Sequence, residues 1–166
     1  HILAILVAVF FALVLGSCGQ KSDKDIILDL MDRVGDHVEK KDIDSLMMYF
    51  AEDYKDFEGR DKNQTRTMIS QYFLDFQGIV SHVLSTHIQD VTPTDASIQT
   101  DVLISSGGAK LFRKFVKYAG DYYRIKAKLV KRDGLWQLQY AEWALISLED
   151  LFPESVSILK KIFPNL

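Results

Sequence analysis

Residues 122–145 read YYRIKAKLVKRDGLWQLQYAEWAL, and apolar and charged side chains alternate along the first half of this stretch. One face carries Tyr123, Ile125, Ala127 and Leu129, and the other carries Arg124, Lys126 and Lys128. A period of two is typical of a β-strand with one buried face. The pair Asp133-Gly134 supplies the positive backbone angles that a tight turn needs. The stretch therefore predicts a β-hairpin.

Two further strands are predicted upstream of this hairpin. Residues 80–88 alternate, which assigns Val80, His82, Leu84, Thr86 and Ile88 to one buried face. A turn at residues 92–95 leads to a second alternating run over residues 96–104, which residues 105–108 interrupt. Residues 109–121 fit a strand, a loop or both. The sequence thus predicts about four antiparallel strands.

Three helices are predicted before the sheet. The first begins near Asp25, with Ser22 or Asp23 as its cap. Its apolar residues recur at helical spacing and are Ile27, Leu30, Met31, Val34 and Val38. The second helix covers residues 43–54, and the third opens at Asp61 and stops at Gly78. Helices followed by strands favour an α+β fold with the helices on one face of a sheet.

The order of these elements and three short segments resemble the nuclear transport factor 2-like superfamily over roughly residues 25–146. The segments are residues 46–56, Gly59-Arg60-Asp61, and Asp133-Gly134-Leu135-Trp136 with Glu142-Trp143. The resemblance implies a cone, in which three N-terminal helices pack on a strongly curved, mostly antiparallel sheet around a cavity. It also implies dimerisation through the outer face of the sheet. Members include isomerases, dehydratases, hydrolases and binding modules without chemistry, so the resemblance leaves the function open.

The composition is that of one globular domain. The chain has 166 residues, of which 48% are hydrophobic and 26% are charged, with a net charge of −3. These values argue against a disordered chain and against a protein that crosses a membrane several times. A charge balance this close to neutral gives no reason to expect nucleic acid as a partner.

The amino terminus predicts export. Residues 1–20 carry no Asp, Glu, Lys or Arg, and residues 2–15 form an unbroken apolar run of fourteen. Such a run matches the core of a secretory signal and is shorter than the roughly 20 residues of a transmembrane helix. Leu15-Gly16-Ser17-Cys18 resembles a bacterial lipobox, which implies cleavage before Cys18 and lipidation of its thiol. A single membrane anchor that extends through Gly19 and Gln20 is the alternative.

Four segments follow from this interpretation. Residues 1–17 are the signal peptide, 18–24 the lipidated cysteine and tether, 25–146 the domain, and 147–166 a C-terminal extension with a short helix. A tether of about six residues, at roughly 3.5 Å each, reaches about 20 Å. We therefore expect a lipid-anchored protein of the bacterial envelope on the periplasmic side, with the outer membrane favoured by Gly19. Export also disfavours nucleic acid as a partner.

Candidate site residues come from the expected cone. The residues expected to line its cavity are Tyr49, Tyr54, His82, Tyr123, Trp136 and Tyr140. His82 and Asp53 are the candidate acid and base of an isomerase or dehydratase. The alternatives are a core-edge His82 that hydrogen-bonds locally, a solvated helix end and turn for Glu52, Asp53 and Asp56, and ordinary core packing for the aromatic residues. No metal-ligand spacing is present and no cofactor is predicted.

The charges are unevenly distributed along the chain. Residues 110–132 contain nine Lys or Arg against Asp121 alone. On a lipid-tethered domain this segment fits a face for anionic headgroups or cell-wall polymer. The same segment is equally typical of a strand that faces solvent.

Three functions are compatible with the sequence. The leading hypothesis is an envelope lipoprotein whose cone binds a small apolar ligand, or a partner protein, without catalysis. The first alternative is an isomerase or dehydratase that uses His82 and Asp53. The second is a homodimer through the sheet face that serves as a structural scaffold of the envelope.

Overall fold

The computed structural model describes residues 21–76, 78–106 and 120–151 of the chain. The apolar amino-terminal run, Cys18, most of segment 109–121 and the extension beyond Leu151 lie outside these ranges, so the predictions made for them stay predictions. Within the ranges, no helix is both long and apolar enough to cross a membrane.

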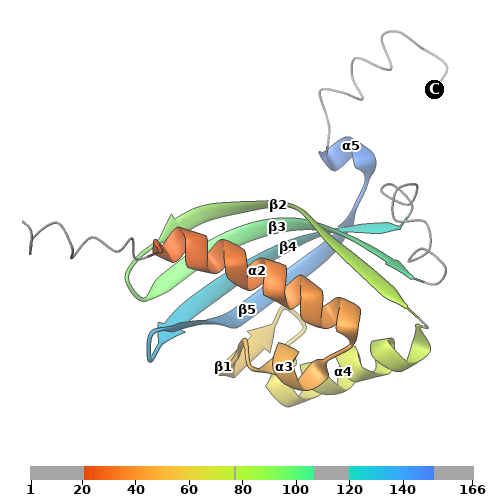
Figure 1. Ribbon diagram of the computed structural model, residues 1–166, viewed down its shortest axis with the longest axis horizontal. Helices are drawn as coiled ribbons and strands as arrows, with labels where there is room; N and C mark the ends of the chain where they lie inside the picture. The colour runs from red at the N-terminus through yellow and green to blue at the C-terminus, as the bar shows by residue number, and fades with distance from the viewer. Residues whose placement is uncertain (1–20, 77, 107–119, 152–166) are drawn as a thin grey trace, which may run out of the picture.

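The fold is built on a single curved sheet of five strands (Figure 1). The strands are β1 (Phe50–Asp56), β2 (Ile79–Val91), β3 (Asp95–Ser106), β4 (Asp121–Arg132) and β5 (Leu135–Ile146). Strands β2 to β5 form an antiparallel meander, and β1 pairs with β5 in parallel, which gives the order β1-β5-β4-β3-β2. The α+β prediction is confirmed, with one strand more than expected.

Helices cover one side of the sheet, which we call the inner face. Helix α2 (Asp23–Lys40) crosses this face along the strands, whereas α3 (Ile43–Met47) and α4 (Lys62–Asp75) lie towards the β1 edge (Figure 1). The short helix α5 (Leu148–Leu151) follows β5. Ser22 caps α2, since its Oγ accepts from the backbone N–H of Asp25 at 3.2 Å and the Asp25 carboxylate accepts in return. Asp61 caps α4 in the same way.

The second predicted helix is too long. Helix α3 ends at Met47, and the residues expected to continue it form β1 instead. The N–H of Leu138 donates to the carbonyl of Tyr49 at 2.7 Å, and that of Phe57 donates to Ala141 at 3.1 Å. Because these bonds join β1 to a strand some 85 residues later, no local pattern could indicate them.

The hairpin prediction is confirmed. Strands β4 and β5 meet at Asp133 and Gly134, whose φ angles are 52° and 80°. Both residues therefore adopt the left-handed region that a two-residue turn of type I′ requires.

Two hydrophobic clusters fill the space between α2 and the sheet. The first joins the amino-terminal half of α2 to β3, β4 and β5 through Ile27, Leu30, Met31, Ala96, Ile98, Ala127, Leu129 and Trp136. The second lies around α3, β1 and α4 and contains Leu46, Met47, Phe50, Tyr54, Phe73, Ile79 and Ala141. The half-buried Val34 and Leu138 pack against both clusters.

Lys41 joins the carboxyl ends of two helices. Its backbone, at φ 56°, forms the left-handed cap of α2, and its Nζ donates to the carbonyls of Phe73, at 2.6 Å, and Phe76 at the end of α4. A cation is favoured at that position because the last carbonyls of a helix carry partial negative charge.

We expect Lys41→Met to lower the free energy of unfolding by about 1–2 kcal/mol, because two carbonyls lose a charged donor. The matched control is Lys40→Met, an exposed neighbour for which a change within about 0.5 kcal/mol is expected. Urea denaturation of both variants provides the measurement. Equal effects of the two substitutions would show that Lys41 does not connect the helices.

Candidate functional site

The cross-strand register defines which side chains lie on the inner face. Gly35 of α2 faces β2, since a Cβ placed on it would lie 3.7 Å from the Ser81 Oγ and 3.9 Å from the Val83 Cγ2. Ser81 and Val83 therefore point towards α2. Residues paired directly with them across the sheet share that face, because paired side chains lie on the same side.

Two rows of paired residues cross β2, β3, β4 and β5 on the inner face. The first row is Thr86, Thr100, Ile125 and Trp143, and the second is Val83, Val102, Tyr123 and Leu145. We call these eight residues the open half of the inner face. Only Thr100 and Val102 are buried, whereas the other six are half-buried or exposed. The adjacent row, which includes Ile98, Ala127 and Ala141, is buried under α2.

An exposed apolar rim borders the open half. Leu145 is 65% exposed at the end of β5, and Tyr72 and Phe76, from the end of α4, are 55% and 39% exposed. The rings of Tyr72 and Phe76 stack in parallel with their centroids 6.2 Å apart. Phe57, also exposed, meets Trp143 edge to face at 4.9 Å. Aromatic and aliphatic walls of this kind suit an apolar ligand.

The side chains of the open half are apolar or carry a hydroxyl group. None of its eight positions holds a carboxylate, imidazole, ammonium or guanidinium group. The hydroxyls of Thr86 and Thr100 bond to each other at 3.1 Å. Burial, with the negative charge of Asp121 second, raises the pKa of Tyr123, so its phenol is neutral at physiological pH. The surface is therefore uncharged.

A buried ion pair lies beside the open half. Asp56 is 3% exposed, and its carboxylate accepts from the backbone N–H groups of Glu58 and Arg60 at 2.9 Å each and from the Arg60 Nε at 2.6 Å. The guanidinium of Arg60 also bonds to Glu58 and lies 5.5 Å from the ring centroid of Trp143. Burial, with the Asp56 charge second, raises the pKa of Tyr54. The polar groups of Asp56, Glu58 and Arg60 are therefore paired with one another, and the Arg60 guanidinium holds the Trp143 ring in place beside the open half.

The prediction of a solvated helix end and turn at Asp56 is wrong about its exposure, because the residue lies beside a turn but is buried. Strand β1 replaces the end of the predicted helix, and the buried Asp56 carboxylate accepts from the backbone of the turn that follows the strand. The spacing Asp56–Arg60 before the Asp61 helix cap is the one sequence signal that could have indicated a structured turn.

His82 lies on the outer face, contrary to the prediction. It pairs with Leu103, whereas its neighbours Ser81 and Val83 point towards α2. The register of β2 shifts between Val83 and Ser85, so the strand contains a bulge at this point. A bulge inserts one residue and reverses the faces beyond it. The alternation that includes Thr86 and Ile88 therefore cannot be extended back across the bulge to His82.

Asp53 lies on the edge strand β1, four strands from β2. At about 4.8 Å between neighbouring strands, roughly 19 Å of sheet lies between the strand of His82 and that of Asp53. The Asp53 carboxylate is exposed and accepts from the Arg132 Nη2 at 2.7 Å and from the Gln139 Nε2 at 2.9 Å. These bonds lower the pKa of Asp53 to about 2. The two residues cannot act as an acid–base pair on one substrate.

The Asp53 ion pair predicts a pH dependence. Its folded pKa lies below the unfolded value, so the stabilisation it provides is present above pH 4 and is lost as the pH falls through about 2. We expect Arg132→Gln to raise the Asp53 pKa towards its ordinary value in a carboxyl NMR titration. The control is Arg33→Gln on α2. An unchanged Asp53 pKa in Arg132→Gln would contradict the assigned cause.

The other predicted cavity residues occupy different surroundings. Tyr123 belongs to the open half, whereas Tyr54 is buried in the second cluster and Trp136 in the first. The half-buried Tyr49 packs against the first cluster. Tyr140 pairs with Lys128 on the outer face and its hydroxyl bonds to Glu142 at 3.2 Å.

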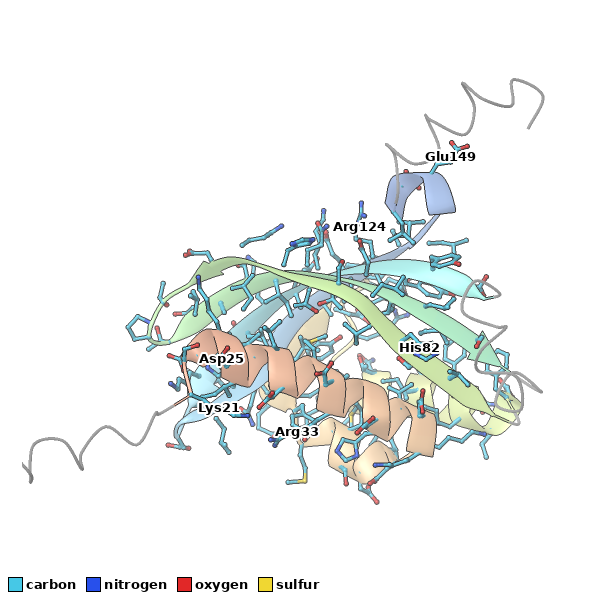
Figure 2. The ribbon with its side chains drawn as sticks, turned by 45° about the horizontal axis from the view of Figure 1, so that its top comes forward. Lys21, Asp25, Arg33, His82, Arg124 and Glu149 are labelled. Atoms are coloured by element: carbon cyan, nitrogen blue, oxygen red, sulfur yellow. The ribbon has the colours of Figure 1, made fainter. Side chains whose placement is uncertain are left out.

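The outer face carries Arg124, Lys126 and Lys128 of β4, and Figure 2 shows Arg124 on the side of the sheet away from α2. Four of the five bases described between residues 120 and 132 pair with carboxylates. The pairs are Arg124–Asp101, Lys126–Glu142, Lys131–Asp23 and Arg132–Asp53. This pairing favours a solvent-facing strand over a basic binding face. Across the described residues, no three His, Cys, Asp or Glu side chains gather as metal ligands would.

Comparison with known proteins identifies the fold. No family model matches the sequence, and no curated protein matches it. Among solved structures, a hexachlorocyclohexane dehydrochlorinase from Novosphingobium barchaimii superposes with a TM-score of 0.59 at 12% identity, over 75% of this chain and 86% of its own. An NTF-2-like protein of unknown function from Pseudomonas aeruginosa gives 0.60 at 13% identity, over 74% and 99%.

A third structure, Bd1075 of Bdellovibrio bacteriovorus, gives a TM-score of 0.60 at 15% identity over 74% of this chain. The match spans only 40% of the Bd1075 chain. The fold is therefore the cystatin-like fold of nuclear transport factor 2-like proteins, as the sequence resemblance implied. Proteins with this fold include both enzymes and proteins of unknown function.

Proposed function

We propose that this protein binds a small, uncharged apolar or amphipathic ligand on the open half of the inner face, without catalysis. The observation that carries the proposal is the uncharged character of that surface together with its exposed aromatic rim. The half-buried hydroxyls of Thr86 and Tyr123 offer hydrogen bonds to a polar end of such a ligand. A charged ligand would lose its hydration there without gaining a counter-ion.

Within residues 21–76, 78–106 and 120–151, no acid–base pair faces the open half, which supports binding without catalysis. His82 lies on the outer face and Asp53 is held by Arg132 at the sheet edge. The nearby Asp56 already accepts three hydrogen bonds, so it is poorly placed to take a proton from a ligand. The fold does host enzymes, since one neighbour is by name a dehydrochlorinase.

We also propose that the protein acts while anchored to a bacterial envelope membrane. The support is the sequence Leu15-Gly16-Ser17-Cys18 after the apolar run, and the single cysteine of the chain. Two or more acyl chains on one residue give stable anchoring. The domain would then begin only a few residues from the bilayer.

Thermal denaturation with matched ligand pairs tests the binding proposal. Each pair consists of a neutral ring compound and its carboxylated analogue, such as 2-methylnaphthalene and 2-naphthoate. We expect neutral members alone to raise the melting temperature, since a ligand at 100 times its Kd adds about 2.7 kcal/mol of stability. Stabilisation by the carboxylates alone, or by no compound in a broad set of pairs, would refute the proposal.

A further inference from the structure

We infer that the anchored protein points its open half away from the membrane that holds it, so that ligand enters from the aqueous compartment. This orientation rests on the proposed function, because it takes Cys18 as the membrane anchor. It goes beyond that function in specifying which phase supplies the ligand.

The tether joins the domain at the turn between β4 and β5. Helix α2 begins at Asp23, whose Oδ1 accepts from the Lys131 Nζ at 2.6 Å and from the Trp136 Nε1 at 3.1 Å. Lys131 and Trp136 lie on either side of the β4–β5 turn. These bonds fix the start of α2 against that hairpin, so the tether leaves the domain there.

The open half lies at the opposite end of the sheet. Trp136 and Leu145 are both on β5, nine residues apart, which corresponds to about 30 Å along a strand. Helix α2 has 18 residues and extends about 27 Å from the same end of the sheet. Figure 1 shows that α2 starts at the end of the sheet where the β2–β3 and β4–β5 turns lie, and that α4 lies beside the far end of α2.

The tether is too short to allow the reverse orientation. Four residue steps separate Cys18 from the cap residue Ser22, and an extended chain covers at most about 3.6 Å per step, hence about 14 Å in total. If the open half faced the bilayer, the start of α2 would lie about 30 Å above the membrane. The anchor could not reach that far.

Charge disfavours a domain that rests on its helical side. Helix α2 carries six acidic residues against three Lys or Arg. Figure 2 shows Asp25 and Arg33 on this helix, whose outward surface is solvent-exposed. Anionic headgroups repel such a surface. With the hairpin turns near the membrane, the tether reaches the bilayer and the apolar rim stays in water.

Two leucines on β5 make a matched test of this orientation. Leu135 is 67% exposed beside the β4–β5 turn, and Leu145 is 65% exposed in the open half. Lipidation consumes the thiol of Cys18, the only cysteine, so Leu135→Cys and Leu145→Cys each introduce one thiol for a bimane label. The labelled, lipidated full chain is bound to phosphatidylcholine and phosphatidylglycerol vesicles that carry a spin-labelled headgroup.

We expect strong headgroup quenching of bimane in the Leu135→Cys chain and little in the Leu145→Cys chain, with the reverse order for iodide added to the water. Equal or stronger headgroup quenching at position 145 would overturn the orientation. Flotation with the vesicles, and the mass of the peptide that contains Cys18, test the anchor separately. A chain that carries no lipid refutes the anchor, whereas a lipidated chain quenched at position 145 refutes the orientation alone.

Discussion

Replacing Asp56 with alanine is expected to lower the free energy of unfolding by about 3–5 kcal/mol. The substitution leaves the backbone N–H groups of Glu58 and Arg60 without their acceptor. It also leaves the Arg60 guanidinium half-buried beside Trp143 without its main partner. Removal of one member of a buried pair is costly because the other charge stays desolvated.

Asp53→Ala is the matched control for this substitution. Asp53 is an aspartate on the same strand that also pairs with an arginine, but its carboxylate is exposed. We expect its loss to have a much smaller effect than the loss of Asp56, because water screens an exposed ion pair. The double variant Asp56→Ala/Arg60→Met should recover part of the loss, because it removes the unpaired cation. Urea unfolding that ranks Asp53→Ala level with Asp56→Ala would contradict the assigned role.

The second large effect is expected for Ile125→Trp, which adds volume at the centre of the open half. Ile125 is half-buried and pairs with Thr100 and Trp143. If this surface is open to ligand, the indole occupies the space of the ligand without straining the core. We therefore expect at least a tenfold loss of affinity for the neutral dye N-phenyl-1-naphthylamine, with stability changed by less than about 1 kcal/mol.

The matched control is Ala144→Trp, which adds an indole at an exposed, outer-facing position next to Trp143 in the chain. It should leave dye affinity unchanged. If the inner face is instead closely packed, Ile125→Trp lowers the free energy of unfolding by about 1–3 kcal/mol through overpacking. Dye fluorescence and urea unfolding on the same samples separate these outcomes.

Local signals in the sequence predicted the elements that local chemistry stabilises. Ser22 and Asp61 cap their helices through side-chain bonds to residues three positions away. Asp133 and Gly134 form the turn of the hairpin because both adopt positive φ. Each of these features depends on residues close together in the chain, so residue type and position were sufficient to predict it.

Features that depend on distant partners were not predictable in the same way. Strand β1 exists because β5 pairs with it, and its apolar residue Phe50 fits a helical stripe equally well. The bulge in β2 depends on pairing with β3, and it moved His82 to the outer face. Of the residues predicted to line the cavity, Tyr123 lies in the open half, while the contribution of Trp143 required the register of four strands.

The most direct test of the binding surface is a methyl NMR titration of the isoleucine residues with N-phenyl-1-naphthylamine. Ile125 lies in the open half and Ile104 beside it, whereas Ile27 and Ile98 are buried in the first cluster and Ile146 lies on the outer face. We predict saturable shifts for Ile125 and Ile104, with the other three unchanged. Shifts confined to Ile146, or no saturable shift at Ile125, would contradict a ligand site on the inner face.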